Sequence, residues 1–406
     1  MVAGQSLTGS GVVTVGGLAQ LKTGSGQALT LTNSANNFST VLIERAGNVS
    51  LVDASGIVLG KSSVSGTFEL AAGGSISSVG ALAITGNATL SAVLASGTNT
   101  ADISLDNAAN DFAGTVTLTA ARHASVRDAN ALAMGNVTLS GNLNLQSGDD
   151  LSGAGVVSVS GSTTLSARKM VSTVNAGVTT VRNTATTTFD NVANDFVGLV
   201  SVTDSNDIRL VDANSLSFTG AATGTGADLS LKAVAGNLKL GVASATGTAT
   251  LTAGADVSLD LTSVGGNLIL SAGGAVTQGK LNDDGTVSAN TASVLRVAGD
   301  ATLMAASLNL GNANVIGVTD NTGDLRTLAG NVTLNTSGNA VLRSTGSLTL
   351  ASATVAGTAV STAIGGDLTL TVGGDLFDSS RVVVTGAALL TVGAGKDVVL
   401  DGVNAN

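Results

Sequence analysis

The sequence predicts an all-β protein, and within that class a parallel β-helix (β-solenoid) that winds through about 20 coils of roughly 20 residues each. Three observations predict it. A five-residue phrase recurs along the chain, its closing leucine returns at a nearly constant interval, and the chain has no Pro, Trp or Tyr. The first two indicate strands at a fixed period. The third indicates strands that are hydrogen-bonded on both sides, because Pro has no N–H to donate.

The composition argues against several other classes of protein. Only Glu44 and Glu69 among the 27 acidic residues are glutamates, and the scarcity of good helix formers disfavours a helical fold. An apolar fraction of 43% can bury a large core, which disfavours disorder. The absence of Cys excludes disulfides and thiol chemistry. A net charge of −10 disfavours nucleic acid and anionic membranes as partners.

The recurring phrase is Gly, then usually Asn, Asp, Ser or Thr, then an apolar or small residue, any residue, and Leu. In Gly-Asn-Val-Thr-Leu at residues 135–139, strand alternation places Val137 and Leu139 toward the core and Thr138 toward solvent. We expect the Gly-Asn pair to supply a turn that tolerates a positive φ. The copies begin at residues 47, 86, 135, 161, 266, 330, 346 and 366.

The interval between closing leucines gives the length of one coil. It is about 20 residues both from Leu51 to Leu70 and from Leu70 to Leu90. We therefore expect one continuous β-helical region over residues 1–406, which at about 4.8 Å per coil would be a rod on the order of 95 Å long. A string of β-sandwiches, with strands recurring about every 8–12 residues, is the alternative for this period. Such domains normally use the Pro, Trp and Tyr that are absent here.

A longer repeat overlies the short one. Its copies begin near residues 31, 105 and 189, and a decayed copy lies near residue 310. An Asp-Ala dipeptide follows each of the first three copies, at Asp53, Asp128 and Asp212. We expect the phenylalanines that end these phrases to be core residues stacked at one corner of the coils. They are Phe38, Phe112 and Phe196.

Three motifs point to a known family. They are Asn-Ala-Ala-Asn-Asp-Phe-Ala-Gly-Thr-Val at 107–116, Arg-Asp-Ala-Asn at 127–130, and the Gly-Asn-Val-Thr-Leu strands. In these the chain resembles, over nearly its whole length, the filamentous-haemagglutinin-type exoproteins of bacteria. The resemblance implies a right-handed parallel β-helix, two-partner or autotransporter secretion through an outer-membrane transporter, and adhesion at the cell surface. Because the Asn-Pro motifs of the family's secretion domain are missing, we expect an internal shaft segment behind an added start Met.

No catalytic, cofactor-binding or metal-ligating residue is predicted, and we expect no enzyme activity. His123, the only histidine, is expected to face solvent in a divergent coil. The acidic candidates are expected to lie in turns, because adjacent residues of a strand point to opposite faces and cannot form a general acid–base pair. A Ca²⁺ contact or a pair of catalytic carboxylates is the alternative. These candidates are Asp149 with Asp150, Asp283 with Asp284, and Asp204 with Asp207.

The Asn residues that follow Gly are expected to form ladders, in which each side-chain amide bonds to the equivalent residue one coil away. Several also make Asn-x-Ser/Thr sequons, so that glycosylation is an alternative role. These sequons lie at Asn37, Asn48, Asn87, Asn136, Asn331 and Asn335.

Together these features predict a structural and adhesive shaft segment of a large secreted surface exoprotein that supports cell adhesion, aggregation or biofilm. The expected partners are a host or bacterial receptor or glycan, and other copies of the chain through lateral or end-to-end association. The alternative is a β-helical carbohydrate-active enzyme or a polysaccharide-binding protein of the phage-tailspike type. Such a protein would carry two or three carboxylates in one groove.

Overall fold

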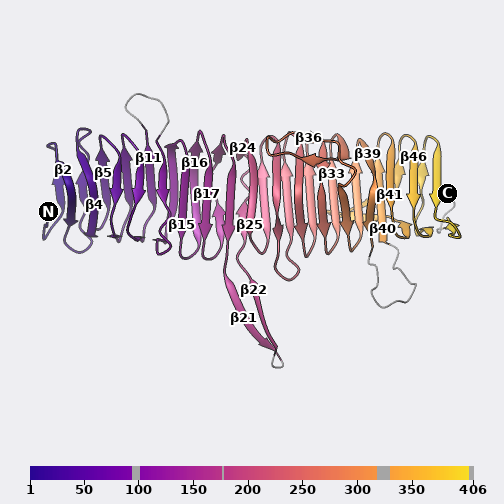
Figure 1. Cartoon of the computed structure of the whole chain (residues 1–406), viewed down its shortest axis with the longest axis horizontal. Helices are drawn as coiled ribbons and strands as arrows, with labels where there is room; N and C mark the ends of the chain where they lie inside the picture. Colours follow the sequence, from indigo (N-terminus) through magenta and orange to yellow (C-terminus); the bar gives the residue numbers. More distant parts are fainter. Residues whose placement is uncertain (94–100, 176–177, 318–329, 402–406) are drawn as a thin grey trace. The chain divides into compact units, whose positions relative to one another are not determined.

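The computed structural model describes residues 1–93, 101–175, 178–317 and 330–401. These residues form strands and turns without a helix, which confirms the predicted all-β class. It follows that no described segment is a helix long and apolar enough to cross a membrane. The coils fall into two compact units, residues 1–205 and residues 206–406. Within each unit, successive coils lie side by side in the order of the sequence (Figure 1).

Each coil of unit 1 contributes parallel strands to two large sheets, called here the first and the second face. Three further strands form a short third sheet. The first face contains β1 (Leu7–Gly9), β3 (Leu29–Leu31), β5 (Val49–Asp53), β8 (Phe68–Ala72), β11 (Ala88–Ala92), β14 (Thr115–Ala121), β16 (Leu132–Leu139), β18 (Leu151–Gly153), β19 (Val157–Val159), β23 (Thr187–Phe189) and β24 (Asp195–Phe196). The second face contains β2 (Thr14–Lys22), β4 (Asn37–Arg45), β6 (Ile57–Leu59), β9 (Ile76–Ser78), β12 (Ile103–Leu105), β15 (Ala124–Asp128), β17 (Leu143–Ser147), β20 (Thr163–Ala167) and β25 (Leu199–Asp204). The short sheet contains β7 (Ser62–Val64), β10 (Leu82–Ile84) and β13 (Asp111–Phe112).

Unit 2 repeats this plan with two parallel faces. The first face contains β26 (Ile208–Asp212), β28 (Leu229–Ala233), β30 (Ala249–Ala253), β33 (Leu268–Ala272), β38 (Ala301–Ala305), β40 (Gly330–Thr336), β42 (Leu348–Leu350), β45 (Ala363–Ile364), β47 (Leu376–Asp378), β48 (Val383–Val384) and β50 (Val398–Val399). The second face contains β27 (Leu216–Ala222), β29 (Leu238–Ala245), β31 (Val257–Leu259), β32 (Leu261–Val264), β34 (Ala275–Gln278), β37 (Val294–Val297), β39 (Ser307–Ile316), β41 (Ala340–Ser344), β46 (Leu368–Val372) and β49 (Ala388–Val392).

The pairing register confirms a coil of about 20 residues, the step at which a β-solenoid returns to the same face. In unit 1, Leu29 pairs with Val49, Val49 pairs with Phe68, and Phe68 pairs with Ala88. Each partner therefore lies one coil further along the chain, in a parallel strand. In unit 2 the same step joins β28, β30 and β33.

The predicted alternation of the five-residue phrase is confirmed in β16. Val137 and Leu139 are 0% and 2% exposed, whereas Thr138 between them is exposed. Val137 pairs with Val157 of the next coil and Leu139 pairs with Val159, so that aliphatic side chains lie over one another from coil to coil. Each such buried side chain contributes about 1.5–3 kcal/mol to stability.

The Gly that opens the phrase does not use the tolerance of positive φ that was expected of it. Neither Gly47 nor Gly86 has a positive φ. Instead, a Cβ on Gly47 would lie 2.4 Å from the carbonyl oxygen of Gly26 in the preceding coil, and a Cβ on Gly86 would lie 2.5 Å from that of Gly66. Glycine is required there because the backbones of successive coils approach too closely to admit a side chain, not because the turn is left-handed.

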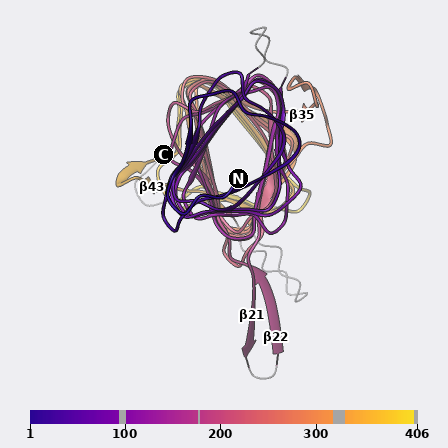
Figure 2. The ribbon, with the colours of Figure 1, turned by 90° about the vertical axis from the view of Figure 1, so that its left-hand side faces the viewer.

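Three antiparallel hairpins leave the coils in the described part of the chain, and the sequence analysis predicted none of them. They are β21 (Met170–Asn175) with β22 (Val178–Asn183) in unit 1, and β35 (Lys280–Leu281) with β36 (Val287–Ser288) and β43 (Ala353–Val355) with β44 (Thr358–Val360) in unit 2. Figures 1 and 2 show β21 and β22 projecting away from the coils of unit 1. The hairpin of β21 and β22 lengthens its coil, because Thr163 pairs with Val200, nearly twice the step of about 20 residues that a plain coil needs.

Candidate functional site

The longer repeat places a buried Asn at the point where the chain turns between strands. Asn110 is 0% exposed, and its side chain hydrogen-bonds to three consecutive coils. Its Oδ1 accepts from the N–H of Leu82 (2.9 Å), and its Nδ2 donates to the carbonyl oxygens of Leu105 (2.9 Å) and Arg127 (3.2 Å). A buried amide with these partners fixes the register between coils, since each bond that is lost would leave a backbone group unsatisfied.

The other copies of the repeat use their Asn in the same way. Asn36 and Asn194 are 0% exposed and accept from the N–H groups of Val13 and Val157, respectively, both at 2.9 Å. The decayed copy near residue 310 keeps the device, because Asn314 is 0% exposed and accepts from the N–H of Leu295 at 2.9 Å. The long repeat is therefore a structural element.

The Asp-Ala dipeptides lie one coil beyond these Asn residues, which explains their spacing. The Oδ2 of Asp128 accepts from the N–H of Phe112 (2.7 Å), and its Oδ1 accepts from the N–H of Asn130 (2.6 Å). Burial raises the pKa of the Asp128 carboxyl, against the two N–H donors that lower it, and the nearby charge of Asp111 raises it further. In the copy near residue 310 the position equivalent to Asp128 is occupied by Ser344, which is buried. Ser344 follows Arg343, whose carbonyl oxygen accepts a hydrogen bond from Asn314.

The three repeat phenylalanines are buried, as predicted, but they do not stack on one another. Each belongs to a different sheet of unit 1 and pairs in register with an aliphatic residue of the preceding coil. The pairs are Phe38 with Val15, Phe112 with Ile84, and Phe196 with Val159. The ring of Phe196 meets that of Phe189 edge to face, with centroids 6.3 Å apart.

A ladder of polar side chains does run from coil to coil, but its donors are backbone groups and not the predicted amides. In unit 1, the side-chain acceptor of one residue takes the N–H of the equivalent residue in the next coil. The Oδ1 of Asp102 accepts from His123 (3.1 Å), the Nδ1 of His123 accepts from Asn142 (2.8 Å), and the Oδ1 of Asn142 accepts from Ser162 (3.0 Å). His123 is thus a half-buried rung of this ladder and does not simply face solvent, as had been expected.

The sequons belong to the same kind of ladder. Asn48, Asn87 and Asn136 are exposed, and the Oδ1 of each accepts from a backbone N–H of the next coil at 3.0 Å. Of the other three, Asn37 and Asn331 are exposed and Asn335 is half-buried. Glycosylation of these residues stays a prediction.

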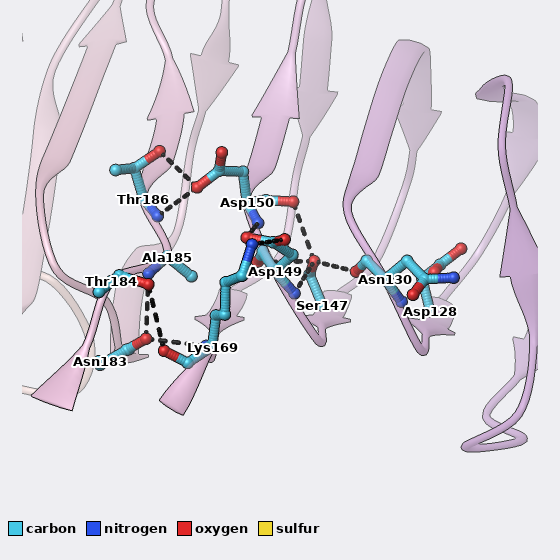
Figure 3. A network of polar contacts seen from close by, with 10 residues as sticks. All are labelled: Asp128, Asn130, Ser147, Asp149, Asp150, Lys169, Asn183, Thr184, Ala185 and Thr186. Carbon is cyan, nitrogen blue, oxygen red and sulfur yellow. Dashed lines mark hydrogen bonds and ion pairs between the residues drawn. The ribbon is translucent and has the colours of Figure 1, made fainter. Parts of the chain in front are cut away.

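The doublet Asp149–Asp150 lies at the base of the hairpin of β21 and β22, and Figure 3 shows its contacts. Asp149 forms an ion pair with Lys169, which precedes the outgoing strand. Asp150 accepts from the N–H (2.8 Å) and the Oγ1 (3.0 Å) of Thr186, which follows the returning strand. The two carboxylates therefore bind different partners, and both support the base of the hairpin.

Asn183 closes this base from the inside (Figure 3). It is 8% exposed, and its Oδ1 accepts from the N–H groups of Lys169 (2.8 Å) and Ala185 (3.1 Å). Its Nδ2 donates to the carbonyl oxygen of Ala167 at 2.8 Å. One buried side chain thus binds both the segment that leaves the coil and the segment that returns to it.

The remaining acidic candidates are separate from this base. Asp284 lies in the turn between β35 and β36, where its Oδ1 accepts from the Oγ1 (2.6 Å) and the N–H (2.9 Å) of Thr286. These bonds lower the pKa of the Asp284 carboxyl. Its neighbour Asp283 is exposed, and Asp207 accepts from the N–H of Asp228 at 2.9 Å. Where the chain is described, no three His, Cys, Asp or Glu side chains lie close enough together to hold a metal ion.

A groove on the outer surface of unit 1 brings polar side chains together from four successive strands. It has a volume of about 420 Å³ and lies over β15, β17, β20 and β25. Its lining is mostly polar, with two cationic side chains, the half-buried carboxylate of Asp204, the buried Asp128, and amides and hydroxyls between them. The lining residues that matter here are Arg127, Asn144, Gln146, Thr164, Ser166, Arg168 and Asp204.

Of the lining residues, sequence analysis had named Asp204, Asp128 and the Arg-Asp-Ala-Asn motif at 127–130, but it had not predicted a groove. The strand pattern could have indicated one, because Arg127, Gln146 and Ser166 occupy outward positions of strands one coil apart. A second polar groove of about 380 Å³ lies in unit 2, where Gln278, Asn290 and Asn312 are among its lining residues.

Comparison with known proteins gives one match. A family model described as repeats of unknown function (DUF5649) matches residues 1–43, 46–119 and 121–203 of this chain. The matched segments lie within unit 1, and the repeats they contain fold here as stacked parallel strands. No curated protein and no solved structure matches the chain significantly.

Proposed function

We propose that this chain is a shaft segment of a large secreted bacterial surface protein of the filamentous-haemagglutinin type, and that it supports adhesion of the cell that carries it. The observation that carries the proposal is that the strands of the coils bury the side chains on one side and expose those on the other. The inward side chains, such as Val137 and Leu139, pack on their equivalents in neighbouring coils, while outward side chains such as Thr138 are exposed. A scaffold that repeats by nearest-neighbour stacking can display a contact surface over many coils.

The hairpin of β21 and β22 supports an adhesive role over a passive one. Met170, Val174 and Val181 are 49%, 71% and 57% exposed, although each is a residue type that usually lies in a core. Met170 is paired with Asn183 and Ser172 with Val181, so that these apolar side chains lie on one face of the ribbon. Exposed apolar side chains on a projecting element are typical of a contact surface.

A polysaccharide-binding protein, with or without cleavage, is the second candidate, and the groove of unit 1 favours it. Two carboxylates line that groove, Asp128 and Asp204. Because the carboxylate of Asp128 accepts from two backbone N–H groups, Asp204 is the better candidate for contact with a sugar. A hydrolase would release new reducing ends from a polysaccharide, and its activity would be lost in Asp204→Asn.

The test of the adhesive role is a bead assay. Beads coated with the purified chain are expected to bind epithelial or bacterial cells more than beads coated with a carrier protein. Replacement of residues 170–182 by a Gly-Gly turn should reduce this binding, and the matched replacement of residues 353–360, which removes a hairpin of unit 2, should not. Binding equal to that of the carrier, with no clumping of the beads, would contradict the proposal.

A further inference from the structure

We propose that the groove on the outer surface of unit 1 binds an acidic glycan, a sugar chain whose anionic groups recur on alternate sugars. The inference rests on the proposed adhesive function, because it names the class of partner that this function would use. It is based on the positions of two arginines whose guanidinium groups form no ion pair, and on the polar side chains that lie between them.

The spacing of the two arginines follows from the strand register. Arg127 of β15 pairs with Gln146 of β17, and Gln146 pairs with Ser166 of β20. Arg168 follows β20 directly, in the same coil as Ser166. The two guanidinium groups therefore belong to coils two steps apart, about 10 Å along the direction of stacking.

Both guanidinium groups are available to a ligand. In the described residues the ion pairs are Lys22–Glu44, Arg122–Asp102 and Lys169–Asp149, so neither arginine of the groove is engaged. Arg127 and Arg168 are exposed, in a chain whose net charge is −10. Asp128 also lines the groove, but it is 2% exposed and its carboxylate accepts from two backbone N–H groups. The charged groups that face a ligand are therefore two free guanidinium groups and the carboxylate of Asp204, and the planar guanidinium fork matches carboxylate or sulfate oxygens.

The groups between the arginines suit a sugar. Asn144, Gln146, Thr164 and Ser166 offer amides and hydroxyls, which both donate to and accept from sugar hydroxyls. The Oδ1 of Asn144 is buried without a hydrogen-bond partner, although its Nδ2 donates to the Oγ of Ser125 (3.3 Å). One sugar of an extended chain advances by about the length of one coil step. A sugar chain lying along the coils would therefore present successive sugars to successive coils, and alternate sugars to the two arginines.

The carboxylate of Asp204 marks the other end of the groove. It pairs in register with Ser166, three coils from Arg127, and it would repel an anionic group placed beside it. Its removal should therefore strengthen the binding of an acidic sugar chain and leave the binding of a neutral one unchanged.

The experiment measures binding of hexasaccharides to the full chain by isothermal titration calorimetry. The probes are unsulfated chondroitin and chondroitin sulfate, which both carry a uronate on alternate sugars, and chitin hexasaccharide as the neutral chain. We expect binding of the acidic probes that weakens with salt, and little binding of the neutral one. The difference between the two acidic probes tells whether carboxylate alone suffices or sulfate adds to it.

The variants test the residues. Arg127→Gln and Arg168→Gln are each expected to weaken binding at least tenfold, and Asp204→Asn should strengthen it. The matched control is Arg296→Gln, which removes an exposed, outward arginine from β37 of unit 2 and should change nothing. Circular dichroism confirms that each variant is folded. Equal binding of the neutral hexasaccharide or of poly-glutamate, or indifference to both arginine variants, would overturn the inference.

The two proposals fail separately. If coated beads adhere to cells while no acidic hexasaccharide binds, the groove inference is wrong and the adhesive function stands. If the acidic hexasaccharides bind through both arginines while the beads do not adhere, the groove is a glycan site and the adhesive function is wrong.

Discussion

Strand β16 in the coils and strand β21 in the hairpin both contain β-forming residues but lie in opposite environments. Both contain an adjacent Val and Thr, Val137–Thr138 in β16 and Thr173–Val174 in β21. Yet Val137 is 0% exposed and Val174 is 71% exposed. The difference lies in their neighbours, because β16 pairs with the coil before it and the coil after it, whereas β21 pairs only with β22. Alternation therefore predicts a strand, and the presence of a next coil decides whether one face of that strand is buried.

The two regions are also held in place by different interactions. The coils are held by buried aliphatic side chains and by buried polar groups such as Asn110. The hairpin is held at its base, by Asn183 and by the partners that Asp149 and Asp150 bind on either side of it. Substitutions should therefore have large effects in the coils and small effects along the ribbon.

The largest effect is expected for Leu139→Asp in β16. The change removes about 1.5–3 kcal/mol of burial and places an unpaired carboxylate in the core, which costs several kcal/mol more. The coils on either side should become open to protease and to hydrogen exchange. Coils far from residue 139 should stay protected, because coupling in a solenoid runs between neighbours.

The control for this change is Thr138→Asp, at the exposed position between Val137 and Leu139. It should alter the free energy of unfolding by about 0.5 kcal/mol or less. If both substitutions were tolerated equally, the buried and exposed faces of β16 would be assigned wrongly. Loss of protection across all coils from Leu139→Asp would contradict nearest-neighbour coupling.

Asn110→Ala is expected to have the next largest effect. It leaves the N–H of Leu82 and the carbonyl oxygens of Leu105 and Arg127 without their partner, and each unsatisfied buried group costs about 1–3 kcal/mol. Hydrogen exchange should increase in the three coils that this side chain joins. The matched change Asn136→Ala, in an exposed ladder residue, should cost no more than about 1 kcal/mol; an equal cost for both would contradict a register-fixing role for Asn110.

The pH dependence of two carboxylates gives a third comparison between a coil and a hairpin. The pKa of Asp128, in the coils, is raised above the ordinary value of 3.8 chiefly by burial, whereas the pKa of Asp284, in the turn of β35 and β36, is lowered below it chiefly by the side chain of Thr286. A carboxyl NMR titration should place the midpoint for Asp128 above that for Asp284.

The signs of the two contributions to stability differ accordingly. Folded Asp128 binds its proton more tightly than the unfolded chain does, so its contribution is present at low pH and is lost as pH rises through its raised pKa. The contribution of Asp284 is present above the unfolded value and is lost as pH falls through its lowered pKa. Midpoints in the reverse order would contradict the assigned environments.

The smallest effect is expected for Val174→Asp in the hairpin. Because this side chain is exposed, the free energy of unfolding should change by about 0.5 kcal/mol or less in urea denaturation. Val137→Asp, the same change in β16, should destabilise its coil by several kcal/mol. A large cost at residue 174 would mean that the ribbon packs against another surface in solution.

The coil could be predicted from the amino-acid sequence alone. Leucines at a nearly constant interval and a two-residue alternation suffice, because every coil meets the same neighbours and a local pattern repeats the same contacts. The long repeat was visible for the same reason, and its decayed copy still carries a buried Asn314. These features lie within a short segment or recur at a fixed interval, so that they can be found in the sequence without the structure.

The contacts between one coil and the next could be identified only in the folded chain. Position 47 requires glycine because the carbonyl oxygen of Gly26, on another coil, lies too close to admit a side chain. The His123 ring belongs to the polar ladder because its Nδ1 accepts from the N–H of Asn142, on the next coil. The hairpin was not predicted because its strands contain the same β-forming residues as the coils. No local sequence pattern shows that these strands have no coil on either side. The groove joins Arg127 to Arg168, which are far apart in the sequence, and stacking alone brings two such positions onto one surface.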